Sequence, residues 1–318
     1  MRITDFVVLC VVAPIILTIF PYFLVAQNDT TIHYAYELPA ACGNNQIVSH
    51  FAYTLSYNEQ HEQADWVAYL LTRERVSNKI TSRSDNFRPD PFVKTGSAEL
   101  IDYKSVDDNG THYDRGHLAP AADMAWDNKA MSESFFLSNM SPQTAGFNRG
   151  IWKNLEELLR AWALEYDTLF VATGPVLTSA LPKLGVNKVS IPEYYYKVIL
   201  RLSENDTLAI GFILPNASSK AQLSSFAVTI DSVETFTGID FFPALPDEFE
   251  EKVESNLCVP CWSWEKTVST SSAEKKTNEN GPERRKSSVQ CSAMTQAGTR
   301  CKRQTYSPNG KCAQHGGD

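Results

Sequence analysis

The chain has 318 residues, of which 43% are hydrophobic and 11% aromatic, so it can bury the core of one large domain with a small appendage. Its formal net charge of -8 excludes a protein that binds nucleic acid through overall charge, although a local basic cleft is compatible with this value. The charge is uneven, because residues 265–318 contain ten Lys or Arg against five Asp or Glu and so carry +5.

The first predicted element is an uncharged apolar run over residues 6–26. Its length suits a membrane span, while Leu24 and Ala26 offer an imperfect cleavage site for a signal peptide. A buried core helix is the weaker interpretation, because the run starts almost at Met1. We therefore assign residues 1–26 as a signal peptide or membrane anchor. The rest of the chain is expected to be exported, to a periplasmic or extracellular location, or to be anchored to the membrane through residues 6–26 if the run is not cleaved.

Residues 27–257 mix strand and helix patterns around one predicted core. Apolar residues at 151, 152, 155, 158, 159 and 162 predict an amphipathic helix over 151–166. Residues 66–76 fit either a strand or a short helix, and two prolines make 82–93 a loop. Further strands are predicted at 50–58, 168–177, 194–202 and 207–216. Mingled strands and helices favour an α+β fold.

The stretch YDRGHLAPAADM, residues 113–124, places an acid, a cation and a titratable ring side by side. Gly116 allows a close approach of the backbone to another group, or a positive φ. His117 lies near Arg115 and therefore tends to stay neutral and able to accept a proton. These residue types suit chemistry on an anion. Hydrolysis of a phosphodiester needs an activated water, stabilisation of charge on the phosphate and help for the departing oxygen.

Five segments in this order carry a resemblance to a known family: DRGHLAPAADM, FFLSNMSPQTAGFNRGIWKNLE, TGPVL, YYYKVIL and GFILPN. Together they resemble the DNA/RNA non-specific endonucleases of the Serratia nuclease and endonuclease G type, over roughly residues 35–250. The resemblance implies a ββα-metal nuclease fold, with a central antiparallel sheet flanked by helices, as the domain of residues 27–257. It also implies a sugar-non-specific endonuclease that hydrolyses DNA and RNA.

The resemblance assigns roles to individual residues. His117 is the implied general base, and Asn148 is the implied direct ligand of a hydrated Mg²⁺ ion, for which Mn²⁺ can substitute. Glu156 follows eight residues later, about 80° round an ideal helix, and is expected to hold the metal through water. Arg115 is expected to clamp the phosphate with its planar guanidinium and Asn139 to support the site.

Arg83 is the predicted second phosphate-binding residue, although Arg88 in the same loop competes with it. Plainer interpretations stay open for several residues. His117 can be a structural histidine, Asn148 can cap the helix near residue 151, and Glu156 can lie on a solvated helix face.

Because contacts to phosphate and sugar read little sequence, DNA and RNA are expected to bind with weak sequence preference. The resemblance leaves a homodimer open. Two other functions also stay open: an inactive nuclease-like domain that only binds nucleic acid, and a phosphodiesterase of small nucleotides.

Residues 258–290 are predicted to be a disordered linker, because 265–290 contain almost no apolar residues. The CxxC of Cys258 and Cys261 either forms a disulfide or supplies metal ligands. In residues 291–318, the spacing of three thiols and one imidazole predicts a small Cys3His module folded around Zn²⁺, with disulfides as the rival. The predicted zinc ligands are Cys291, Cys301, Cys312 and His315.

Overall fold

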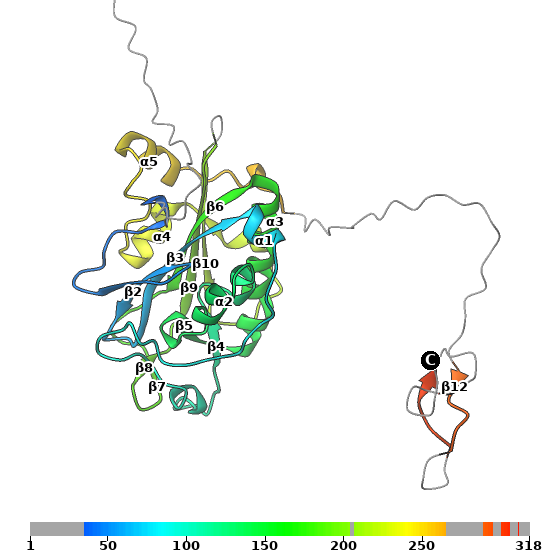
Figure 1. Cartoon of the computed structure of the whole chain (residues 1–318). Coiled ribbons are helices and arrows are strands. Elements are labelled where there is room, and N and C mark those ends of the chain that lie inside the picture. The colour runs from blue at the N-terminus through cyan, green and yellow to red at the C-terminus, as the bar shows by residue number, and fades with distance from the viewer. Residues whose placement is uncertain (1–34, 204–206, 265–288, 295–299, 306–310, 312–318) are drawn as a thin grey trace, which may run out of the picture. The chain divides into compact units, whose positions relative to one another are not determined.

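The computed structural model describes residues 35–203, 207–264, 289–294, 300–305 and 311 (Figure 1). The chain divides into two compact units, residues 1–267 and residues 268–318. The predicted signal or anchor segment, residues 6–26, lies outside the described residues. Within the described part of the chain, no helix is long and apolar enough to cross a membrane.

A seven-stranded antiparallel sheet forms the centre of the larger unit, with the strand order β1-β2-β3-β6-β9-β10-β11. The predicted α+β class with a central antiparallel sheet is therefore confirmed for this unit. The strands are β1 (Gln46–Ser49), β2 (Thr54–Asn58), β3 (Gln63–Thr72), β6 (Thr168–Pro175), β9 (Tyr194–Arg201), β10 (Leu208–Pro215) and β11 (Ala227–Val228).

Both faces of the central strands are buried. Along β3, Val67, Tyr69 and Leu71 point into one hydrophobic core, while the alternate residues Trp66 and Ala68 point into a second core on the other face. The first core is covered by α3 (Lys153–Tyr166), and the second by α4 (Ile230–Thr237) and α5 (Asp247–Glu254). In Figure 1, α4 and α5 lie on the side of the sheet away from α3.

The predicted amphipathic helix is confirmed, with one change at its start. Its apolar face is buried as expected. However, a π-helical turn, Phe147–Trp152, precedes α3, and Gly150 within it has non-helical φ and ψ angles. The 80° angle expected between Asn148 and Glu156 assumed an unbroken helix and does not apply.

Shorter elements complete the larger unit. Residues 66–76 contain both predicted alternatives, since β3 runs directly into α1 (Arg73–Ser77), whose first turn is capped by Thr72. Two further pairs of short antiparallel strands, β4 with β5 and β7 with β8, are separate from the main sheet. The remaining α-helix and strands of this unit are α2 (Asn128–Glu133), β4 (Asp114–His117), β5 (Met140–Gln143), β7 (Lys183–Leu184) and β8 (Val189–Ser190).

Residues 258–264 pack with the larger unit and not as the linker predicted from the sequence. Cys258 and Cys261 form a disulfide. Trp262 is only 3% exposed and its ring lies 4.5 Å from that of Trp162 on α3. The apolar residues that follow the disulfide thus extend the folded unit past residue 257.

The described part of the smaller unit contains two short antiparallel strands, β12 (Val289–Gln290) and β13 (Gln304–Thr305). Cys291 and Cys301 are both buried beside this pair. Their backbone amides donate to the carbonyl oxygens of Arg303 and Ala293. Cys312 and His315 lie outside the described residues, so the Cys3His zinc set stays a prediction.

Two leucines on α3 test which face of this helix stabilises the fold. Leu159 is fully buried in the core, whereas Leu164 is 38% exposed. We expect Leu159→Ala to lower the free energy of unfolding by about 2–5 kcal/mol, because it leaves a cavity. The matched control Leu164→Ala should change it by less than about 0.5 kcal/mol. Urea unfolding followed by circular dichroism measures both, and equal losses would contradict the assignment of the buried face.

Candidate active site

The stretch DRGH forms a strand, β4, in place of the loop suggested by its polar residues. It pairs with β5 so that Asp114 lies opposite Gln143 and His117 lies opposite Met140. A Cβ atom on Gly116 would overlap the buried side chain of Gln143, which explains why a residue without a side chain stands there. The turn at residues 147–152 and α3 follow β5, and we call β4, β5, this turn and α3 the ββα unit.

His117 is almost completely buried, with 8% of its surface exposed. The rings of Phe87 and Phe135 meet its imidazole edge-on, at centroid distances of 5.8 and 4.9 Å. Burial, together with the positive charges of Arg83 and Arg115, lowers the pKa of His117 to about 3. Its Nε2 atom has no hydrogen-bond partner among the described residues. The ring is therefore neutral at pH 7, and this nitrogen is not engaged by any other described residue.

The two candidate arginines in the loop before β4 have different surroundings. Arg88 donates to the backbone and side-chain oxygens of Ser132 and lies over the ring of Phe136, so it ties the loop to α2. Arg83 is half exposed, pairs with Asp85 in its own loop, and lies over Phe135, the ring that also contacts His117. Of the two, Arg83 is the one whose charge acts on His117.

Arg115 is exposed, and its guanidinium lies 4.0 Å from the centroid of the Phe87 ring. Because successive side chains of a strand point to opposite faces, Arg115 and His117 share one face of β4. The structure therefore gathers Arg83, Arg115 and His117 around the two rings Phe87 and Phe135.

Asn148 is half-buried and bound to the first residue of the same strand. Its Nδ2 donates to Oδ2 of Asp114 over 2.9 Å, and Arg149 donates two further bonds to the Asp114 carboxylate. Burial alone would raise the pKa of Asp114, but the hydrogen bonds from Arg149 and Asn148 lower it below its usual value. Because the amide nitrogen is engaged, the Oδ1 atom of Asn148 is the group left to act as a ligand.

His117 and Asn148 are held on the same ββα unit. Asn148 binds Asp114, the first residue of β4. Trp152, four residues further along the chain, donates through its indole to the backbone oxygen of His117, the last residue of β4, over 3.4 Å. The start of the helix thus contacts both ends of β4. Asn148 lies inside the π-helical turn and not at its N-cap, so its position is not that of a capping residue.

Glu156 lies in a group of buried charges that sequence reasoning did not foresee. Burial raises the pKa of Glu156, whereas the positive charges of Lys197 and Arg160 counteract this shift. Lys197 is fully buried, with its Nζ 4.6 Å from the centroid of the Trp152 ring. Arg160 donates to Asp123 over 2.7 Å. The spacing of Glu156 and Arg160, four residues apart on one helix, is the sequence signal that could have indicated this group.

Asn139 is completely buried and supports the chain on both sides of it. Its Oδ1 accepts from the amide of Ala119, and its Nδ2 donates to the carbonyl oxygens of Ala119 and Ser134. It therefore fixes the segment that follows His117 against the end of α2. Asn139 acts on the site through the backbone, since its polar atoms are all engaged.

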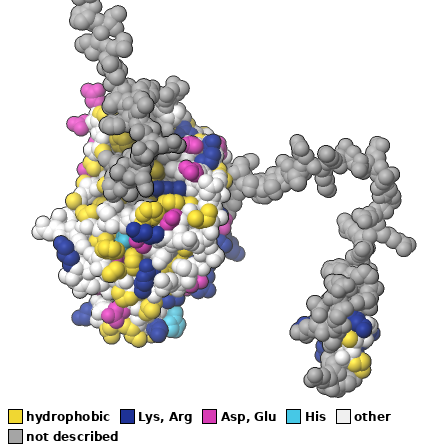
Figure 2. Space-filling view, in the orientation of Figure 1, with side chains coloured by type: hydrophobic (Ala, Val, Ile, Leu, Met, Phe, Trp, Pro, Cys, Tyr) yellow, Lys and Arg dark blue, Asp and Glu magenta, His cyan; other side chains and the backbone are white. Residues whose placement is uncertain are grey.

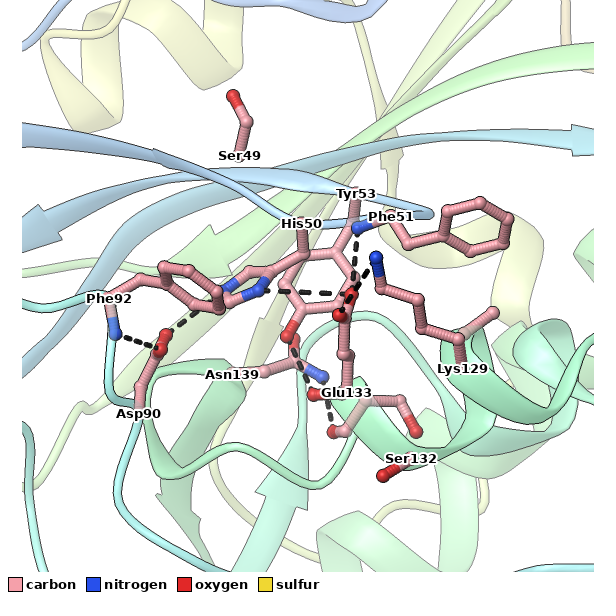
Figure 3. A network of polar contacts seen from close by, with 12 residues as sticks. Ser49, His50, Phe51, Tyr53, Asp90, Phe92, Lys129, Ser132, Glu133 and Asn139 are labelled. Atoms are coloured by element: carbon pink, nitrogen blue, oxygen red, sulfur yellow. Dashed lines mark hydrogen bonds and ion pairs between the residues drawn. The ribbon is translucent and has the colours of Figure 1, made fainter. Parts of the chain in front are cut away.

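A second buried network adjoins Asn139 (Figure 3). His50 and Ser138 both bind Asp90, at 2.9 and 2.5 Å, and Glu133 accepts from the amide of Phe51. Burial opposes ionisation of Asp90, but its hydrogen bonds to His50 and Ser138 lower its pKa. This network joins the loop after β1 to the loop that carries Arg83.

A cavity of about 460 Å³ lies elsewhere, lined by residues 40–45, Asp65 and the end of α4. Its lining includes none of the residues predicted to act in catalysis. The chemistry we expect therefore belongs to the ββα unit and not to this cavity.

Comparisons with known proteins agree with the geometry. The family model of the DNA/RNA non-specific endonucleases matches residues 31–248. Mitochondrial nuclease EXOG of Danio rerio is 34% identical over 221 residues, covering 65% of this chain and 62% of that protein, so the chain spans less than two thirds of it. Mitochondrial endonuclease G of Homo sapiens is 33% identical over 222 residues, covering 65% and 72%.

Two further matches extend this picture. Nuclease C1 of Cunninghamella echinulata var. echinulata is 33% identical over 226 residues, covering 65% of this chain and 85% of that protein. A chain in the crystal structure of the EndoG/EndoGI complex, described as showing the mechanism of EndoG inhibition, aligns with a TM-score of 0.59 and 32% identity. It covers 65% of this chain and 89% of that chain.

The low pKa of His117 predicts how stability depends on pH. The unfolded chain binds a proton at this residue near pH 6.5, whereas the folded chain does so only near pH 3. Stability is therefore fully present above pH 6.5 and is lost as the pH falls toward 3. Between these limits, the free energy of unfolding should fall by up to roughly 1.4 kcal/mol per pH unit more in the wild type than in His117→Gln.

Chemical unfolding at a series of pH values measures this difference. His112→Gln, in an exposed residue just before the same strand, is the control and should behave as the wild type does. Parallel profiles for the wild type and His117→Gln would show that the imidazole is not held neutral by the fold.

Proposed function

The chain belongs to the DNA/RNA non-specific endonuclease family, and from this we propose that it is a metal-dependent endonuclease that hydrolyses the phosphodiester bonds of both DNA and RNA. The observation that carries the proposal is the neutral imidazole of His117 on the same ββα unit as Asn148, with two guanidinium groups beside it. A base, a ligand and phosphate-binding cations are the groups that this hydrolysis needs.

His117 serves as the general base. Its Nε2 takes a proton from a water molecule as the oxygen of that water forms a bond to phosphorus and the bond from phosphorus to the leaving oxygen breaks. A bound phosphate brings negative charge close to the ring and offsets the repulsion from Arg83 and Arg115, so the pKa of His117 rises when substrate is present. The imidazole can then hold the proton it has accepted.

Arg115 and Arg83 bind the phosphate. Their planar guanidinium groups can each donate two parallel hydrogen bonds to phosphate oxygens, and the rings of Phe87 and Phe135 hold them in place. Lys and Arg side chains lie among hydrophobic ones across the drawn face of the larger unit (Figure 2). Contacts of this kind read the backbone of the nucleic acid, which supports weak sequence preference and activity on both sugars.

The donor set around Asn148 fits a hydrated hard cation. Oδ1 of Asn148 is a neutral oxygen with no hydrogen bond among the described residues, and Asp114 fixes the orientation of the amide. A Mg²⁺ ion held there, or Mn²⁺ in its place, would supply positive charge to the phosphate and to the leaving oxygen. Glu156 is proposed to hold this ion through water, with Lys197 and Arg160 favouring its ionised form.

The remaining parts of the chain extend the proposal. We place the protein outside the cytoplasm, or on a membrane through residues 6–26, and we leave the homodimer as a hypothesis. Cys291 and Cys301 lie together in a buried cluster and fit half of the proposed zinc set with Cys312 and His315. Zinc measured in purified residues 27–318 tests this module, and disulfides without zinc would contradict it.

The variant His117→Ala tests the catalytic proposal. We expect cleavage of plasmid DNA and of RNA to fall by about 10²–10⁴-fold, because the general base is lost. His112→Ala is the matched control and should keep full activity. EDTA should abolish cleavage by the wild type, and added Mg²⁺ or Mn²⁺ should restore it.

The same assay separates the other two functions. An inactive binding module would retain plasmid without cutting it, and a phosphodiesterase of small nucleotides would hydrolyse a dinucleotide but not plasmid. Either result, with circular dichroism showing a folded protein, would contradict the endonuclease proposal.

Asp114→Asn tests how the ligand residue is held. The variant keeps the shape of the side chain but loses the charge that binds Arg149 and orients Asn148. We expect the Mg²⁺ concentration for half-maximal activity to rise by roughly 10–100-fold. Asp108→Asn, in an exposed residue of the preceding loop, should leave it unchanged, and an unchanged value in Asp114→Asn would contradict the role given to this carboxylate.

A further inference from the structure

Three carboxylates from two helices meet on the face of the sheet away from the ββα unit. Asp231 and Glu234 lie three residues apart on α4, and Glu254 is the last residue of α5. One carboxylate oxygen from each lies within 4.8 Å of the others. We call these three residues the α4–α5 cluster.

Glu254 differs from an acid on a solvated surface because its side chain is buried. It is only 6% exposed, and its Oε1 is buried with no hydrogen-bond partner among the described residues. Leaving a buried carboxylate oxygen unpaired costs free energy, and such groups in folded proteins are normally hydrogen-bonded or bound to a metal. A carboxylate oxygen of Glu254 also lies within 4.8 Å of one oxygen of Asp231 and one of Glu234, which are acids as well.

The surroundings add negative charge to the cluster. Glu250, one turn earlier on α5, also has a buried Oε1 without a partner, and Asp240 is close enough to act on Glu254 electrostatically. None of the ion pairs found among the described residues involves the cluster. Glu254 also lies at the C-terminal end of its helix, where the helix dipole disfavours a carboxylate and favours a cation. Burial, followed by the charges of Glu234 and Glu250, raises the pKa of Glu254 to about 9.

The size of the cluster can be compared with the ligand spacing of common cations. Ligands on opposite sides of a Ca²⁺ ion lie about 4.6–5.2 Å apart, since Ca–O distances are about 2.3–2.6 Å, whereas those of Mg²⁺ lie only about 4.0–4.2 Å apart. The carboxylate oxygens of the cluster lie within 4.8 Å of one another, so a Ca²⁺ ion fits between them without movement of the helices. Ca²⁺ also accepts irregular arrangements of carboxylates, as two separate helices provide here.

We propose that Asp231, Glu234 and Glu254 form a Ca²⁺ site that joins α4 to α5 and stabilises the face of the sheet opposite the ββα unit. The site is separate from the proposed catalytic ion in position and in role. The bound ion would hold α4 and α5 together over the second hydrophobic core, to which they contribute Ile230, Val233 and Val253.

Calorimetric titration of CaCl₂ into the full chain carrying Asn148→Ala tests this site. That substitution removes the proposed catalytic ligand, so the binding that remains reports the α4–α5 cluster, and the outcome does not depend on whether the protein is a nuclease. We expect one Ca²⁺ ion to bind, and Glu254→Gln and Asp231→Asn to weaken binding by roughly tenfold or more. Asp231 is exposed, so its variant keeps the test valid if Glu254→Gln folds poorly. Glu251→Gln, at an exposed position of α5, is the matched control and should bind as the parent does.

Thermal unfolding gives a second readout. Ca²⁺ should raise the Tm of the parent and of Glu251→Gln by several degrees, because it binds only the folded state. It should leave the Tm of Glu254→Gln unchanged, and Mg²⁺ should raise the parent Tm less. The proposal is overturned if the parent binds no Ca²⁺, if both cluster variants bind it as tightly as the control, or if Mg²⁺ binds as tightly as Ca²⁺.

Discussion

The contact between Asp114 and the start of the helix is the constraint on which the proposed active site depends. This carboxylate joins the first residue of β4 to Asn148 and Arg149, while Trp152 holds the last residue of the strand. A strand of four residues cannot keep its orientation alone, and β5 pairs with it along one edge. The helix therefore sets where Arg115 and His117 point, through polar contacts to the Asp114 carboxylate at one end of the strand and to the backbone oxygen of His117 at the other.

The two faces of the sheet carry different groups of charged side chains. Around Glu156, two acids and two bases lie close together, so the buried charges of Asp123, Arg160 and Lys197 compensate one another. Between α4 and α5, several acids meet, and none of the ion pairs found in the described part of the chain involves them. The two groups also differ in exposure, since Asp231 is exposed whereas Asp123 and Lys197 are buried. In the first group the acids and bases offset one another, whereas in the second burial and the neighbouring acids raise the pKa of Glu254.

The sequence predicted the elements whose pattern is local. The helix over 151–166 followed from its apolar spacing, and β6, β9 and β10 followed from continuous apolar runs. A run buried on both faces has no alternation, so the pattern over residues 66–76 could not separate a strand from a helix. The π-helical turn at Gly150 was not predictable, since it depends on how residues 147–152 meet β4.

Residues that act through long-range contacts were harder to find. Lys197 reads as one polar residue within an apolar strand, and only the packing of β9 under Trp152 shows that its charge faces Glu156. Glu254 and Asp231 are more than twenty residues apart, on helices whose polar residues look like ordinary solvated faces. In both cases the sequence shows a charged residue, and only the fold shows which charges surround it: Glu156 for Lys197, and other acids for Glu254. For Lys197, the alternation of side chains along β9 decides which face of the sheet its charge enters, whereas for Glu254 the packing of α5 beside α4 decides which acids it meets.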